Sequence, residues 1–328
     1  MNGLKPAALS LLACFLCVCC LASCGKEMPG RLDGQYPDAL TSQTFIGHSS
    51  GESDDEASSQ AGGGENDASS GSDEKAYPAP AFRAGSYTME SSGVNEQYIY
   101  SGKSVVSFTR VTQIYDYDIR LAVRKNGSMS AVYTFSRIRT GYETPDGSDK
   151  TDTSVRKGRN DDNAVYYDLI GQSFTAEISK DYSITLKGID LIHKKYPYTA
   201  DVVTDENMKE VVADLFYKMG SSLQSGSRWK LKQVGVTNTY TVASVKNGSV
   251  YINIKGTQLD IPEPFTRDGV KYTYQKREPL SGSLVISMDN RMVQEQSSYQ
   301  ENSGVIESGD RKYTFTESAA SICNIKMK

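Results

Sequence analysis

The sequence has little of what most catalytic and metal sites are made of. Its 328 residues include two histidines, one tryptophan and six cysteines, and five of the cysteines lie within residues 14–24. His48 lies in a polar stretch, and His193 stands alone in a predicted short helix. A Ser-His-Asp triad would rest entirely on His193, and a partly exposed helix residue is the simpler explanation of it. We therefore predict no catalytic residues, no metal and no cofactor.

Long hydrophobic runs are scarce as well. The one long, almost entirely apolar stretch covers residues 7–21, which is too short to span a bilayer comfortably. It follows Lys5 and ends in the sequence Leu21-Ala22-Ser23-Cys24. A short positive segment, an uncharged apolar segment and small residues before a cleavage point are typical of a signal peptide.

These residues resemble the lipobox of bacterial lipoproteins. The resemblance implies a diacylglyceryl group on the Cys24 thiol and cleavage of the Ser23–Cys24 bond, which removes residues 1–23. It also implies export to the cell envelope, with the anchor in the outer face of the cytoplasmic membrane or in the outer membrane. Two alternatives stay open: a metal or redox cluster, which the irregular cysteine spacing disfavours, and an uncleaved signal anchor. After cleavage Cys24 and Cys323 remain, so no intramolecular disulfide is expected.

Residues 24–84 lack any apolar periodicity. Residues 49–75 carry eight acidic residues and one lysine among serines and glycines. Such a stretch buries too little apolar surface to offset the entropy of folding, so we predict a disordered tether that spans roughly 45 Å as a random coil. A cation-binding tail is the alternative. The net charge of −4 comes from this stretch, and nothing indicates a nucleic-acid partner.

Residues 85–328 are rich in Tyr, Val, Ile and Thr, which predicts an α+β domain of mainly antiparallel strands. Apolar residues alternate on both sides of Lys125-Asn126-Gly127. A three-residue loop there pairs Val123 with Met129 and keeps the apolar residues on one face.

The same Lys-Asn-Gly-Ser sequence recurs at Lys246, where we expect an equivalent loop that pairs Ser244 with Val250. The segments that begin Ile-Ser-x-Asp at Ile178 and Ile286 also match. We therefore predict duplicated hairpin units, in residues 85–188 and 226–328, that form one curved sheet or two packed sheets.

Residues 189–222 are predicted to join the halves as a helical segment. An apolar stripe from Met208 to Met219 predicts an amphipathic helix that packs on the sheet, with Thr204 as N-cap and Gly220 at its end. A shorter helix is expected from Ile189 to Lys195. Residues 141–163 are read as a long loop, and the last strands are predicted at 283–288, 292–299, 312–317 and 320–327.

The first hairpin, "LIGQSFTAEIS", the helical segment, "SGSRWKL" and "PLSGSLVISMD" resemble a family of β-rich bacterial lipoproteins of unknown function. The layout is also similar to the half-barrel with a helical lid of Lol-type lipoprotein carriers. The second resemblance is architectural only.

The sequence therefore favours a membrane-anchored, non-catalytic lipoprotein whose β domain binds or scaffolds a protein, a cell-wall component or an apolar ligand. Two alternatives remain: a carrier of an apolar ligand or lipid in a half-barrel groove, and a tethered hydrolase that uses acidic residues. For the hydrolase, Asp181 and Asp289 are the matched carboxylates of the two halves. A hairpin turn is the simpler explanation of both.

Overall fold

A computed structural model describes residues 76–328, apart from 234–235, 258–264, 268–269 and 309–310. The helices are α1 (Ala164–Leu169), α2 (Ile189–Lys195) and α3 (Asp205–Ala213), with single 3-10 turns at Arg156–Gly158 and Pro197–Thr199. The strands are β1 (Tyr77–Pro78), β2 (Gly85–Ser101), β3 (Ser104–Val123), β4 (Met129–Thr144), β5 (Gly147–Asp152), β6 (Ser173–Ile178), β7 (Ile184–Lys187), β8 (Ser222–Leu223), β9 (Arg228–Gln233), β10 (Val236–Lys246), β11 (Ser249–Gly256), β12 (Phe265–Arg267), β13 (Val270–Arg277), β14 (Ser281–Ser287), β15 (Val293–Ser308) and β16 (Arg311–Met327).

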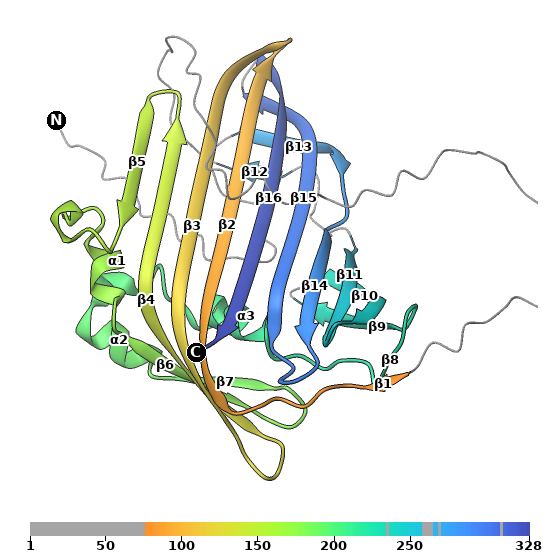
Figure 1. The fold of residues 1–328 in the computed structure, drawn as a ribbon. Coiled ribbons are helices and arrows are strands. Elements are labelled where there is room, and N and C mark those ends of the chain that lie inside the picture. Colours follow the sequence, from red (N-terminus) through yellow and green to blue (C-terminus); the bar gives the residue numbers. More distant parts are fainter. Residues whose placement is uncertain (1–75, 234–235, 258–264, 268–269, 309–310) are drawn as a thin grey trace, which may run out of the picture. The chain divides into compact units, whose positions relative to one another are not determined.

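Most of these strands form one open antiparallel sheet (Figure 1). Its 14 strands follow the order β7-β6-β4-β3-β2-β16-β15-β14-β11-β10-β9, with β5 beside β4 and β13 beside β15, and β12 beside β13. Strands β2, β3, β4, β15 and β16 are 16 to 20 residues long, several times the usual strand length. The prediction of a mainly antiparallel β domain is confirmed, and all strands but β1 and β8 share one sheet.

One face of the sheet, here called the inner face, carries the main core. Alternate residues of β3 and β4 point to this face, and their aromatic side chains are buried: Tyr115, Tyr117, Tyr133 and Phe135. The helices lie at one end of the long strands, and the other end extends beyond them (Figure 1). Most apolar residues of the helical segment are buried in the same cluster, whereas Leu191 and Tyr198 are exposed.

The first hairpin forms as the alternation predicts. Val123 pairs with Met129, and Ile119 pairs with Tyr133. Gly127 closes the loop at a φ of 82°, and the Asn126 side chain accepts a hydrogen bond from the Ser128 amide over 3.0 Å. Glycine at positive φ in a three-residue loop is the expected geometry, so this prediction is confirmed.

The second hairpin has a different loop. Asn247 and Gly248 both have positive φ, 52° and 72°, which makes a two-residue loop between Lys246 and Ser249. Ser244 therefore pairs with Tyr251 and not with Val250 as predicted. A bulge between residues 242 and 244 absorbs the one-residue difference, so the predicted pair of Val242 with Ile252 is retained. The prediction that the two loops are equivalent is wrong, and the duplication stays a prediction.

The two Ile-Ser-x-Asp segments lie at the ends of β6 and β14, each of which pairs with the second strand of one hairpin. Ile178 pairs with Met129 in one half, and Ile286 pairs with Val250 in the other. The turns that follow them meet, because the Arg291 guanidinium lies 5.1 Å from the centre of the Tyr182 ring. The two turns thus share a cation–π contact across the predicted halves.

Helix α3 is shorter than predicted. Thr204 caps it as expected, since its hydroxyl accepts a hydrogen bond from the Asn207 amide over 3.1 Å. The helix ends at Ala213 and not at Gly220, and the Leu215 amide bonds to the Val212 carbonyl, three residues back, in place of a helical bond to Val211. The apolar stripe is nevertheless buried on both sides of that end. Helix α2 has the predicted bounds.

Two polar segments are strands that the sequence pattern did not predict. Residues 141–163 were expected as a loop, but β4 continues to Thr144 and pairs with β5. The two strands predicted at 312–317 and 320–327 are one continuous strand, β16. In both places the polar residues are held by backbone pairing to neighbouring strands rather than by an apolar face.

The described chain packs from Tyr77 onwards, ahead of the boundary predicted at residue 85. Strand β1 pairs with β8, and the Phe82 and Phe216 ring centres are 5.1 Å apart. Residues 1–75 lie outside the described residues, and with them most of the predicted tether. No helix among the described residues is long and apolar enough to cross a membrane.

Removing residues 1–84 should therefore lower the free energy of unfolding by about 1 kcal/mol relative to removing residues 1–75. The longer truncation loses β1 and the half-buried Phe82 ring, and the shorter one keeps both. Urea unfolding of the two truncated chains measures the difference. Equal midpoints and slopes would show that residues 76–84 add nothing to stability.

Candidate functional site

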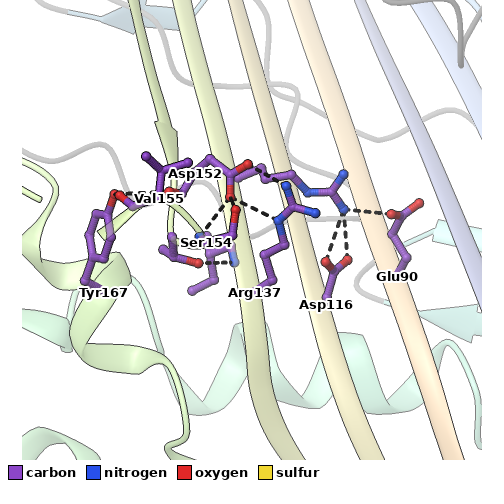
Figure 2. A network of polar contacts seen from close by, with 10 residues as sticks. Glu90, Asp116, Arg137, Asp152, Ser154, Val155 and Tyr167 are labelled. Atoms are coloured by element: carbon purple, nitrogen blue, oxygen red, sulfur yellow. Dashed lines mark hydrogen bonds and ion pairs between the residues drawn. The ribbon is translucent and has the colours of Figure 1, made fainter. Parts of the chain in front are cut away.

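The face opposite the core, here called the outer face, carries a row of ion pairs across four strands (Figure 2). Arg139 on β4 donates to Glu90 on β2 over 2.7 Å and to Asp116 on β3 over 2.9 Å. Arg137 donates to Asp152 on β5 over 3.0 Å. Each guanidinium of this row is thus held by carboxylates of neighbouring strands, which ties β2 to β5.

The protonation of these groups follows from their contacts. The hydrogen bonds from Arg137 hold the pKa of Asp152 well below its usual range. Burial raises the pKa of Asp116, although Arg139 opposes the rise. The Tyr167 hydroxyl lies 2.8 Å from the Val155 carbonyl oxygen, at the end of the same row (Figure 2). The positive and negative charges of the row therefore balance one another, and their contacts connect the strands of the sheet.

The inner face changes character beyond the aromatic core. Its side chains there are amides and hydroxyls, which we call the polar band: Ser91, Asn95, Gln97, Thr109, Gln113, Thr140, Thr151, Gln296, Ser298, Gln300, Asn302 and Ser321. The register places these residues on one face, because β2 and β16 have no register shift from Tyr87 to Ile99. The Ser298 and Ser321 hydroxyls are 2.8 Å apart.

Two carboxylates lie beside the polar band: Asp149 on β5, in register with Tyr142, and Glu317 on β16, at one end of the band. Glu317 accepts hydrogen bonds from the Tyr274 hydroxyl over 2.7 Å and from the Asn302 amide group over 3.2 Å. Gln97 also hydrogen-bonds to it. Burial raises the pKa of Glu317 in spite of these bonds. The amide oxygen of Asn302, a side chain that is 4% exposed, has no hydrogen-bond partner among the described residues.

The residues singled out from the sequence lie elsewhere. Ser23 and Cys24 lie outside the described residues. His193 on α2 contacts the Val203 carbonyl oxygen over 2.6 Å, so it is a helix residue with a structural bond. Asp181 accepts hydrogen bonds from Ser179 and Ser183 within its own turn, and Asp289 lies in the turn after β14. Both aspartates are turn residues.

No described group of three or more His, Cys, Asp or Glu side chains could hold a metal ion. Cys323 is buried in the core of the sheet. The polar band was not predicted from the sequence, where its signal is a period-two pattern of amides and hydroxyls in β2 and β15. The alternate positions hold serine, valine, tyrosine and glutamate, so no regular apolar pattern marks these strands.

No family model matches the sequence, and no curated protein matches it. Among solved structures, one titled "Lipid-protein interactions in lipovitellin" is similar to 75% of this chain, with 10% identity and a TM-score of 0.48. This chain covers 25% of that one. A likeness of this degree assigns neither a family nor a ligand.

Proposed function

We propose that this chain is an exported lipoprotein, held at a membrane through a diacylglyceryl group on Cys24, whose β domain binds a ligand without catalysing a reaction. The observation that carries the proposal is the order of the sequence. An uncharged apolar segment and Leu21-Ala22-Ser23-Cys24 come first, an acidic Gly/Ser-rich stretch follows, and the β domain comes last. That order suits a domain held at a distance from the outer face of the cytoplasmic membrane or from the outer membrane.

Replacing Cys24 by alanine should abolish incorporation of radiolabelled palmitate into the protein. The reason is that the thiol of Cys24 is the proposed attachment point. The matched control is Cys323→Ala, which should keep the label because Cys323 is buried in the sheet. The native chain should also yield a mature N-terminus at residue 24. Undiminished label in Cys24→Ala would refute the anchor.

A carrier of an apolar ligand is the second candidate, and the aromatic core of the inner face favours it. The Tyr133 and Phe174 rings stack with centres 5.0 Å apart, and Phe135 lies 6.1 Å from Phe174. These rings are fully buried by their neighbours, so a ligand could reach them only if the segment around α3 moved away. The variant of Phe216 discussed below tests whether that segment is a permanent part of the core.

A further inference from the structure

The two faces of the long strands differ in a way that folding alone does not require. On the outer face, charged side chains are paired, as in Glu96 with Arg110 and Glu143 with Lys150. On the inner face, the same strands present mainly amides and hydroxyls, and a small apolar cluster of Ile99, Ile306 and Phe315 lies beyond them. No lysine or arginine occupies an inner-facing position from residue 91 to 99 of β2, 107 to 115 of β3, or 315 to 323 of β16. The contrast indicates a surface adapted to an uncharged polar partner.

We propose that the polar band binds a neutral polysaccharide. This inference rests on the proposed binding function and names its ligand class. Amide and hydroxyl side chains both donate and accept hydrogen bonds, as the hydroxyls of a sugar do. An apolar ligand would leave these groups without partners, and a polyanion would meet the carboxylate of Glu317.

The dimensions of the polar band fit a repeating ligand. Neighbouring strands lie about 4.8 Å apart, and side chains on one face repeat about every 7 Å along a strand. Asn95, Gln97, Gln113 and Thr140 are half-buried in the structure, so their polar groups are partly open to a ligand. They form a grid of hydrogen-bonding groups at a spacing comparable to that of linked sugar rings.

Two further features point to a bound hydroxyl compound. The unpartnered amide oxygen of Asn302 and the carboxylate of Glu317 are both acceptors at the same end of the band. A buried acceptor without a donor is unfavourable, and a sugar hydroxyl supplies a donor. Tyr142 lies on the inner face of β4, in register with Val111, and is 40% exposed. Its ring offers an apolar surface for the C–H face of a sugar.

Affinity electrophoresis of the full-length mature chain in detergent tests this proposal. The probes are the neutral polysaccharides dextran, laminarin, mannan and xylan, with polygalacturonate and phosphatidylglycerol vesicles for comparison. We expect at least one neutral polysaccharide to retard the native chain. Tyr142→Ala and Gln97→Ala should each weaken that binding at least tenfold. Glu317→Gln, which keeps the shape of the side chain, should weaken it as well.

The matched control is Tyr299→Ala, because Tyr299 is similarly exposed, at 37%, but lies on the outer face of β15. It should bind as the native chain does. Equal weakening by Tyr142→Ala and Tyr299→Ala would overturn the proposal, and so would binding of only polygalacturonate or vesicles, or of no probe. If no probe binds while palmitate labelling of Cys24 holds, the lipoprotein proposal stands and this ligand class falls.

Discussion

Replacing Phe216 by alanine is expected to lower the free energy of unfolding by about 3–5 kcal/mol, the usual cost of truncating a fully buried phenylalanine. Phe216 is 1% exposed and follows α3, where its amide bonds back to the Val212 carbonyl. Its ring packs on Phe82, and the Arg291 guanidinium lies 4.6 Å from the centre of that second ring. Truncation leaves a cavity between three segments that are distant in sequence.

Urea unfolding of the variant and of the native chain measures this loss. The matched control is Leu191→Ala on α2, a side chain that is 64% exposed, which should change stability by less than about 0.5 kcal/mol. A loss from Phe216→Ala no larger than that of the control would show that the segment is loosely held. Amide exchange from Met208 to Met219 should be slow in the native chain if the segment is core. Fast exchange that slows on adding a hydrophobic ligand would instead support the carrier candidate.

The part of the fold that the sequence predicts best is the first hairpin. There a period-two apolar pattern and a turn with Asn126-Gly127 both restrict the register, and they agree. In the second hairpin, the apolar pattern and the turn sequence do not determine the register. Its two-residue loop and its bulge shift the register in opposite directions, so the apolar faces beyond the bulge are the same as in the predicted pairing. Nothing in the apolar pattern distinguishes the two arrangements.

The segments that were missed are polar on both faces. Strand β5 has the sequence Gly-Ser-Asp-Lys-Thr-Asp, and it becomes a strand because β4 offers a free edge for pairing. The middle of β16 has small and polar residues that suggested a break at Ser318-Ala319. Because β16 pairs with β15 on one side and with β2 on the other, the strand continues without a break through these residues. The polar band escaped prediction for the same reason, since neither face of its strands has a regular apolar pattern.

The stability of the protein is expected to fall as the pH rises from about 4.5 to above 7, because of two carboxylates at the end of α3. Glu210 lies in the last turn, where the helix dipole disfavours negative charge. Burial raises the pKa of Glu210 from 4.5 to about 7, and the charge of Glu206 adds to the rise. Burial also raises the pKa of Asp214, the C-cap residue, and the charge of Glu210 adds to that effect. The folded protein thus retains protons that the unfolded chain has already lost, and its stability falls over that range.

Glu210→Gln keeps the shape of the side chain but replaces the ionisable carboxyl group by a neutral amide. Position 210 then no longer contributes to the pH dependence of stability. The variant should match the native chain near pH 4.5 and exceed its free energy of unfolding by about 2 kcal/mol at pH 8, after allowance for the partial exposure of the carboxyl to water. The matched control is Glu301→Gln, at an exposed carboxylate on β15, which should keep the native pH dependence. Asp152, whose pKa is lowered, contributes its own loss of stability only at more acidic pH, below this range. Urea unfolding at pH 4.5, 6, 7 and 8 measures the slopes, and parallel curves for Glu210→Gln and the native chain would show that Glu210 is ionised in the folded protein at neutral pH.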